Sequence, residues 1–166
     1  MKKYMVLAVV AALLGGGCIF PQSGTPLKIV NYLPELSGNG ETFNLRTGAV
    51  TNVSGAGREF LRRSACSVVQ AIPGSRWLNS PDVMLKSAML TAYNGGSNAI
   101  AVSAQILRFE FSADLKRLDA VIVFAAASGK TVVCAESEPV GDEDYGKALS
   151  RLFNRIIAKA AKEVAK

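Results

Sequence analysis

Few residues of this chain are of a type and spacing that suit a chemical role. The main candidates are its cysteines and one pair of glutamates. Cys18 follows three consecutive glycines, whereas Cys66 and Cys134 stand alone further along the chain. Glu136 and Glu138 are two residues apart, the spacing that puts two side chains on one face of a strand. The chemistry on offer is therefore acylation of the first cysteine, a disulfide between the other two, or acid–base work by the two carboxylates.

The first eighteen residues have the layout of a secretory signal peptide. Lys2 and Lys3 precede an apolar run over residues 5–14, and three glycines then lead to Cys18. The run is too short for a permanent bilayer-spanning helix, which needs about 20 apolar residues. A cysteine directly after small residues resembles a bacterial lipoprotein signal, in which the cysteine becomes the mature N-terminus and carries the acyl chains. Gly15 stands where such signals usually have leucine, and the alternative is an ordinary signal peptide with a chance cysteine.

This N-terminus predicts export, which disfavours cytoplasmic chemistry and nucleic-acid binding. The net charge of +6 falls to +4 without Lys2 and Lys3. This mild excess could help the protein lie near anionic headgroups, but it is too diffuse to mark a binding patch. Ile19 follows Cys18 in place of the aspartate that retains many lipoproteins in the inner membrane, so the resemblance implies the outer membrane, facing the periplasm. We expect a signal peptide over residues 1–17, a lipid-anchored tether over residues 18–26 and one domain over residues 27–166.

The domain must position its few reactive residues with strands and two helices. Strands are expected over residues 27–33 and 42–53, and a hairpin or bent strand pair over residues 58–72. Residues 119–127 and 131–138 flank a tight turn at residues 128–130, which predicts a second hairpin. The first strand of that hairpin is apolar on both faces, so we expect helices on one face and loops or a neighbouring subunit on the other.

A strand over residues 99–111 changes its apolar phase partway along. Its apolar residues hold even positions up to Ile106 and odd positions from Leu107 onward. A strand of period two can do this only through a bulge or by passing between packing layers. Arg108 and Glu110 would then face away from the apolar set.

Two helices complete the pattern. Ser80 and Pro81 are typical of a helix start, and residues 94–96 predict its end with a left-handed cap. The last helix is expected to begin at the cap Asp142. Its apolar face consists of Tyr145, Leu149, Leu152, Phe153, Ile156, Ile157, Ala160 and Val164, and its basic residues are Lys147, Arg151, Arg155, Lys159 and Lys162. Such a helix can lie on a membrane, but we favour packing against the sheet.

The expected fold class is therefore α+β: a two-layer domain whose mostly antiparallel sheet has two main helices packed on one face.

Catalytic hypotheses find little support in the sequence. The chain has no histidine, the usual general base and first-choice metal ligand. Glu136 and Glu138 are better explained as a solvated strand end beside a proline. Cys66 and Cys134 could form a disulfide in an oxidising compartment, although two buried free thiols are the favoured alternative. We therefore expect no enzyme activity, catalytic residue, cofactor or metal site.

Several segments resemble the ABC-type transport auxiliary lipoproteins, which are related to the third component of the paraquat-inducible system. The helix entry RWLNSPDVMLKSAMLTAY matches that family's W-x-x-x-P-x-x-[ML]-L pattern at Trp77, Pro81, Met84 and Leu85. The segments KIVNYL, ILRFEF and ESEPVGDEDYGKALSRLFNRII are similar to its first strand, central strand and closing strand with helix. The resemblance covers nearly all of the mature chain, but its motifs are mostly packing positions.

The resemblance implies a non-enzymatic outer-membrane subunit of an ABC or MCE-type (mammalian cell entry-domain) system that moves lipids or apolar compounds across the periplasm. Its expected partners are an MCE-domain protein and the ABC permease and ATPase, with a homo-oligomeric ring of the chain itself as a further expectation. A lipid-binding carrier or chaperone and an activator of a cell-wall synthase are the alternatives. Trp77 would either pack ahead of its helix or line a groove, and Lys116 and Arg117 are candidate contacts or simply solvated charges.

Overall fold

The computed structural model describes residues 30–32, 41–63, 68–112, 114–141 and 145–165. The expected signal peptide, Cys18 and the tether lie outside the described residues. Cys66 and the expected helix cap Asp142 lie outside them as well.

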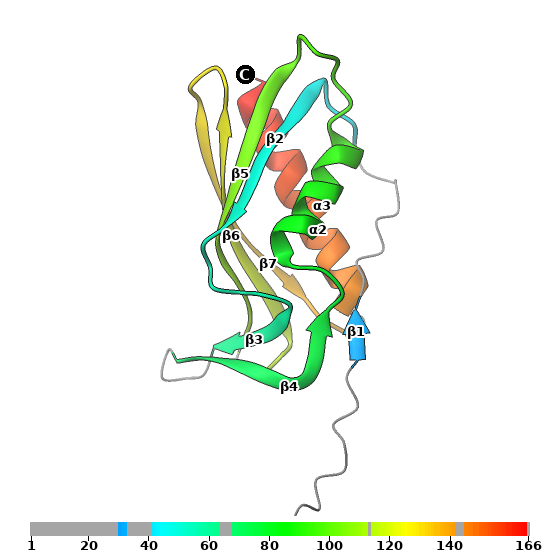
Figure 1. Cartoon of the computed structure of the whole chain (residues 1–166), viewed down its shortest axis with the longest axis vertical. Coiled ribbons are helices and arrows are strands. Elements are labelled where there is room, and N and C mark those ends of the chain that lie inside the picture. The colour runs from blue at the N-terminus through cyan, green and yellow to red at the C-terminus, as the bar shows by residue number, and fades with distance from the viewer. Residues whose placement is uncertain (1–29, 33–40, 64–67, 113, 142–144, 166) are drawn as a thin grey trace, which may run out of the picture.

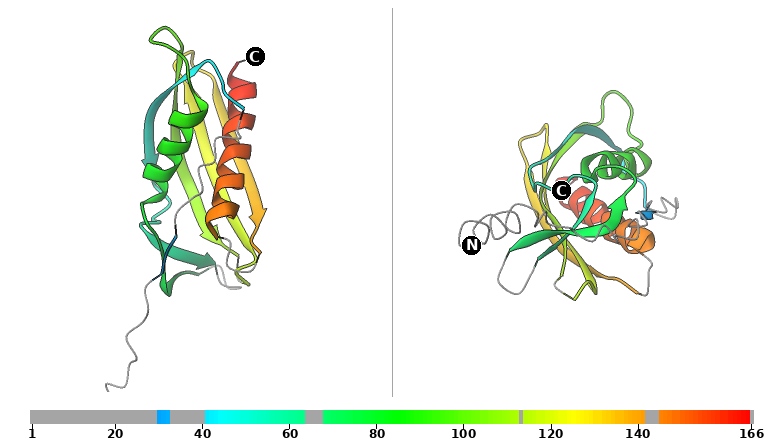
Figure 2. Two further views of the ribbon diagram at one scale, coloured as in Figure 1. Left: turned by 90° about the vertical axis from the view of Figure 1, so that its right-hand side faces the viewer. Right: turned by 60° about the horizontal axis from the view of Figure 1, so that its bottom comes forward.

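The described residues form an α+β domain, with one sheet and two helices on the same face of it, as the sequence predicts. Its elements in chain order are β1 (Val30–Tyr32), β2 (Leu45–Asn52), β3 (Glu59–Arg63), β4 (Val69–Trp77), α2 (Pro81–Ala92), β5 (Ile100–Phe111), β6 (Arg117–Ala126), β7 (Thr131–Pro139) and α3 (Tyr145–Val164). The described strands form one seven-stranded sheet in the order β1-β4-β3-β5-β6-β7, and β2 also pairs with β5 (Figure 1). Figure 2 shows the helices lying along one side of the curved sheet.

The long antiparallel strands β5, β6 and β7 form one side of the sheet, with β7 at its edge. The β6–β7 hairpin is confirmed, with pairing from Arg117 and Pro139 at one end to Ala125 and Thr131 at the other. Gly129 has a φ of 90° in the connecting turn, a left-handed conformation that glycine adopts without strain. Side chains along these three strands point alternately to the two faces of the sheet.

Of the two expected explanations for the phase change in β5, a bulge or a passage between packing layers, the structure shows the bulge. The pairing of β5 with β6 shifts between Ile106 and Arg108, so that two residues of β5 lie opposite Val121. Ile106 and Phe109 on either side of the bulge are buried. The sequence pattern puts Leu107 with the inward-facing set, but 42% of its surface is exposed because it is the residue that the bulge inserts.

The remaining strands all lie on the β5 side of these three strands. The hairpin expected over residues 58–72 is present as β3 and β4, which pair antiparallel, and β4 continues to Trp77. β1 pairs with β4, and β2 pairs with β5, both in parallel. β2 and β3 lie along the same edge of β5, since β2 pairs with its first half and β3 meets it only at Phe111.

Helix α2 begins as predicted but ends differently. Ser80 is the N-cap residue and Pro81 the first helical residue, although the serine side chain makes no capping hydrogen bond. The expected left-handed cap is wrong: the C-cap is Tyr93, in an extended conformation, and it pairs with Phe43. Gly95 is needed for another reason, because a Cβ there would collide with Ala99 and with a backbone carbonyl.

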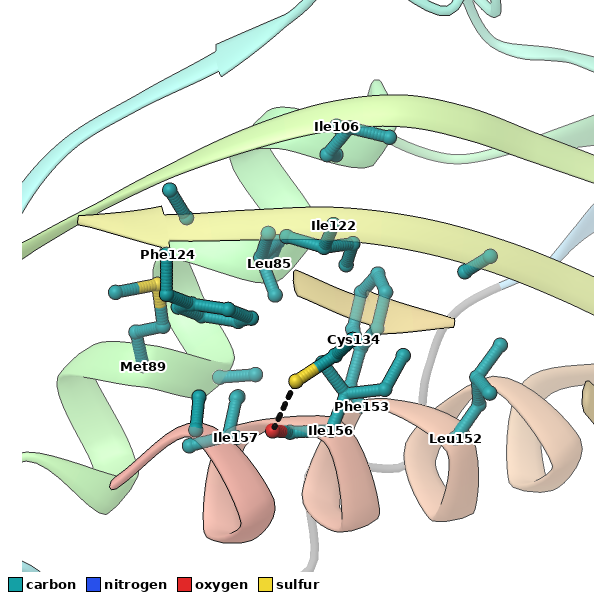
Figure 3. Close-up of a cluster of buried hydrophobic side chains, with 14 of the residues drawn as sticks. Leu85, Met89, Ile106, Ile122, Phe124, Cys134, Leu152, Phe153, Ile156 and Ile157 are labelled. Carbon is teal, nitrogen blue, oxygen red and sulfur yellow. Dashed lines mark hydrogen bonds between the residues drawn. The ribbon is translucent and has the colours of Figure 1, made fainter. Parts of the chain in front are cut away.

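Helix α3 packs its apolar face against the sheet, so the alternative that this face lies on a membrane is not what the structure shows. Phe153, Ile156 and Ile157 of α3 meet Ile122 and Phe124 of β6, all at most 1% exposed (Figure 3). Each such side chain contributes roughly 1.5–3 kcal/mol to folding relative to its exposed state. No helix among the described residues combines the length and apolar composition needed to cross a membrane.

Candidate functional site

The candidate site is the outer face of the sheet, the side of β5, β6 and β7 that faces away from α2 and α3. Val123 of β6 lies between Gln105 of β5 and Val133 of β7, and one row along Val121 pairs with Ala135. Val133 is 61% exposed, and the two β6 valines are half-buried. We call Leu107, Val121, Val123 and Val133 the outer apolar patch. The sequence predicts that β6 is apolar on both faces. The helices α2 and α3 cover its inner face, and the outer apolar patch is on its other face.

Two shallow hollows indent this face. One, of about 270 Å³, is mostly apolar and lies where β2, β5 and β6 meet, lined by Ala49, Thr51, Ser103, Gln105, Val123 and Ala125. The other, of about 320 Å³, is polar and lies toward the start of β6, lined by Arg108, Arg117, Asp119, Val121, Ala135 and Ser137 among others. The outer face therefore offers a partner an apolar area next to a charged one.

A charged network borders the outer apolar patch at the end of the sheet. Glu110 of β5 is only 4% exposed and accepts hydrogen bonds from Arg63 Nε at 2.5 Å, Arg63 Nη2 at 2.9 Å and Arg108 Nε at 2.6 Å. Arg108 also bridges to Asp119 at 3.4 Å, whose carboxylate accepts the hydroxyl hydrogen bond of Ser137. The network joins β3, β5, β6 and β7, and it keeps a buried carboxylate fully paired, as burial of a charge requires.

Glu136 and Glu138, the two carboxylates at strand spacing, do share a face, but it is the face that meets α3. Glu138 is 4% exposed and binds Arg151 at 2.6 Å and Arg155 at 2.7 Å. Glu136 binds Lys159 at 2.6 Å. The expectation of a solvated strand end is therefore wrong for Glu138.

These ion pairs join strand to helix and leave neither carboxylate free to act as a base. The hydrogen bond from Lys159 lowers the pKa of Glu136 below its usual value. The sequence pattern puts Arg151, Arg155 and Lys159 on the side of α3 opposite its apolar face. They lie instead where their side chains reach back to the edge strand β7.

Cys134 is a free thiol buried in the core between β7 and α3. Its Sγ lies 3.9 Å from the carbonyl oxygen of Ile156, as Figure 3 shows, and burial raises its pKa. A raised pKa and a closed environment make a thiol unreactive. Cys66 lies outside the described residues, so a disulfide between the two stays a prediction.

Trp77 packs in the core rather than lining a groove. It is 1% exposed, and its ring lies 4.3 Å from that of Phe60 and stacks on Phe111 at 6.0 Å. Its backbone N–H donates to the carbonyl of Arg58, which closes the end of the β3–β4 hairpin. The residue thus fixes how the chain enters α2.

Lys116 and Arg117, the two candidate loop contacts, are both at the start of β6, where Arg117 is exposed. Arg117 borders the polar hollow, whereas the backbone carbonyl of Lys116 accepts a hydrogen bond from Val140 and helps hold the end of β7. Of the two, the arginine is the one that lines a hollow of the outer face. The Arg63–Glu110–Arg108 network could not be predicted from the sequence, because Arg63 and Glu110 are 47 residues apart along the chain.

No three histidine, cysteine, aspartate or glutamate side chains gather closely enough for a metal site in the described part of the chain. The chain matches no family model and no curated protein. It is similar to the crystal structure of an uncharacterised protein, with a TM-score of 0.61 at 12% identity, covering 82% of this chain and 99% of the other. A DUF330-family protein from Xanthomonas campestris aligns with a TM-score of 0.46 at 13% identity, covering 83% of this chain and 92% of that one. At such identities the first likeness shows a shared fold and nothing about activity.

Proposed function

We propose that the chain is a non-enzymatic outer-membrane lipoprotein, anchored through Cys18, that serves an ABC or MCE-type transport system for lipids or apolar compounds. In this role it holds the MCE-domain partner at the outer membrane, while other chains supply the permease and the ATPase. The support from the sequence is the lipoprotein-type N-terminus and the resemblance to the ABC-type transport auxiliary lipoproteins around Trp77 and Pro81.

The observation that carries the docking role is the outer apolar patch. No element of the described chain covers it, yet Val133 and Leu107 expose 61% and 42% of their surface there. Apolar surface that has no structural partner and is bordered by polar groups is typical of a protein-binding face. Stable interfaces cover about 800 Å² per partner around such a centre, and the apolar patch with the neighbouring polar hollow supplies the mixture that they need.

The charged border gives the face a means of choosing its partner. Arg108 and Asp119 lie in the wall of the polar hollow beside Val121. Because each is already held by a neighbour, their side chains are ordered before a partner arrives, and less side-chain entropy is lost on binding. Charges around an apolar centre contribute mainly to specificity and association rate.

A lipid carrier would need an apolar cavity between sheet and helices. In the described part of the chain, the space between β6 and α3 is filled by close-packed side chains, among them Phe124, Phe153 and Ile157. The observations therefore favour docking over carriage. Activation of a cell-wall synthase would use the same kind of surface, so the identity of the captured protein must separate those two functions.

The test is capture of crosslinked partners from membranes by the mature lipidated protein, with identification by mass spectrometry. Val133→Glu should lower recovery of the MCE-domain protein and its permease at least tenfold, because a charge at the centre of an apolar interface must be desolvated. Leu90→Glu is the matched control, since Leu90 is 60% exposed but lies on α2, and it should leave recovery unchanged.

Three results would contradict the proposal. Recovery of a cell-wall synthase without an MCE-domain protein would assign the patch to synthase activation. Stoichiometric phospholipid with no protein partner would favour the carrier. A homo-oligomer that Val133→Glu dissociates, with no other partner recovered, would show that the patch joins copies of the chain instead.

A further inference from the structure

The β3–β4 hairpin projects from the end of the sheet where strand β5 finishes. β3 meets β5 through one residue pair only, Arg62 with Phe111, and β1 pairs with β4 only from Ser75 onward. The first part of β4 therefore has β3 as its only neighbour among the described strands. Figure 1 shows the hairpin at the end of the molecule where β1 also lies.

Apolar side chains on this projecting part are exposed. Val68 is 53% exposed and Val69 is 41% exposed, and Ala71 and Pro73 are exposed as well. Val133, the most exposed residue of the outer apolar patch, is near the other end of β7, and Val69 pairs with Arg63, which belongs to the charged network that borders the patch. The sheet therefore has a second exposed apolar area, which the proposed docking role does not use.

Arginines flank these valines on both faces of β3. Arg62 pairs with Phe111 and with Gln70, so it belongs to the inner face, beyond the core and opposite to the face of Val69, and its side chain makes no hydrogen bond or ion pair with the described residues. Arg63 faces outward and binds Glu110. Val69 on the outward face and Arg62 on the inward face therefore stand at the same projecting end of the hairpin, and Arg62 has no carboxylate partner in the described chain. This combination matches the chemistry of a bilayer surface, where apolar groups enter the acyl boundary and guanidinium groups bind lipid phosphates.

The position of the chain's N-terminal side points to the same end. Val30 of β1 pairs with Ser75 of β4 in parallel, so the chain enters the described fold beside the hairpin. Cys18 precedes Val30 by twelve residues, and twelve residues span at most about 40 Å when fully extended. An acyl anchor at that cysteine therefore keeps the hairpin end within reach of the membrane.

We infer that the β3–β4 hairpin contacts the membrane surface, with Val68 and Val69 at the acyl boundary and Arg62 on the phosphates of anionic phospholipids. This inference rests on the proposed lipid anchor at Cys18. The contact fixes the orientation of the domain: the hairpin end faces the bilayer, and the outer apolar patch stands at the side of the molecule, accessible to a periplasmic partner. The attraction of basic residues to an anionic surface adds to the apolar contact and makes it depend on the lipid charge.

The test uses Trp77, the chain's single tryptophan, as an energy-transfer donor to dansyl-labelled lipid. It ends β4 and needs no substitution. The full lipidated protein is reconstituted into vesicles of phosphatidylcholine alone or with phosphatidylglycerol. We expect transfer to be at least twofold higher with phosphatidylglycerol, and we expect Arg62→Glu and Val69→Glu each to reduce it toward the phosphatidylcholine value.

Lys130→Glu is the matched control for charge. Lys130 lies in the exposed turn between β6 and β7, at the opposite end of the strands from Arg117, and its replacement should leave transfer unchanged. Equal transfer in both vesicle types, or equal losses from Arg62→Glu and Lys130→Glu, would overturn the inference.

Failure of the anchor is measured separately, by the intact mass of the purified protein. If Cys18 carries no acyl group, the proposed lipoprotein function fails. The hairpin contact then predicts co-sedimentation of the unacylated chain with phosphatidylglycerol vesicles, reduced at least threefold by Arg62→Glu, and no sedimentation would reject the contact too.

Discussion

The two faces of the central strands differ in what surrounds them, although the same strands build both. On the inner face, Ile122, Phe124 and Cys134 are fully buried beneath α3 and α2. On the outer face, Val123 and Val133 alternate with them along β6 and β7, and no described element covers them. Both faces are apolar, yet only one contributes to the core.

The difference separates residues kept for stability from residues available for binding. An apolar side chain in the core is explained by the free energy of folding alone. A valine that remains exposed on a sheet face contributes little to folding, so its chemistry is better explained by what binds there. The contrast makes the outer face testable, because substitutions on it should change binding while the fold persists.

The largest expected effect is the difference in stability loss between substitutions at two neighbouring residues of β6. Phe124→Ala should lower the free energy of unfolding by about 3–5 kcal/mol, because it leaves a cavity beneath α3. Val123→Ala, one residue away on the outer face, should lower it by less than about 1 kcal/mol. Chemical denaturation of both variants measures the ratio, and similar losses would mean that the outer face is also part of the folded core.

A smaller effect is expected for the two buried carboxylates, one on each side of the sheet. Glu138→Gln replaces charge-assisted hydrogen bonds to Arg151 and Arg155, and Glu110→Gln does the same for Arg63 and Arg108. Each substitution should lower the free energy of unfolding by roughly 1–3 kcal/mol. If Glu110→Gln is neutral, the outer network adds nothing to folding stability, unlike the inner ion pairs of Glu138, and the comparison sharpens in favour of a binding role for the outer face.

Much of the fold could be predicted from the sequence because its signals are local. The phase change after Ile106 predicted the bulge, the glycine turn at residues 128–130 predicted the β6–β7 hairpin, and Ser80 with Pro81 predicted the start of α2. The end of α2 was not predictable in the same way. Tyr93 stops the helix by pairing with Phe43 fifty residues earlier, a tertiary contact that overrides the nearby glycines.

The candidate site was less accessible to sequence reasoning. The apolar β6 valines were visible, and an uncovered or partner-covered face was one of the expectations. The charged border was not, because Arg63 and Glu110 come together only when β3 meets β5. For Glu138 the strand spacing was visible but the partners on α3 were not, so the sequence predicts a solvated strand end where the structure has a buried ion pair.

The smallest expected effect is the acid response of the rim where β7 meets α3. Lys159 holds the pKa of Glu136 below its usual value of 4.5. A carboxylate with a lowered pKa in the folded state contributes stability above its unfolded pKa and loses that contribution as the pH falls through the folded one. The contribution is modest, since both side chains are partly exposed.

Glu136→Gln should therefore be less stable than the unsubstituted chain at pH 6. The gap in stability between the two should close as the pH falls below about 4.5, the ordinary pKa of a glutamate, and through the lowered pKa of Glu136 in the folded state. Denaturant midpoints measured from pH 6 to pH 3 give the comparison. Val133→Ala supplies the control, because Val133 lies on the opposite face of β7 and its side chain has neither a charge nor a hydrogen-bonding group. A gap that stays constant with pH would show that Glu136 acts through packing rather than charge. The distinction matters because Glu136 lies on the inner face: a gap that depends on pH would show that ion pairs to α3 hold the rim of that face, whereas the outer face has no described element to pair with.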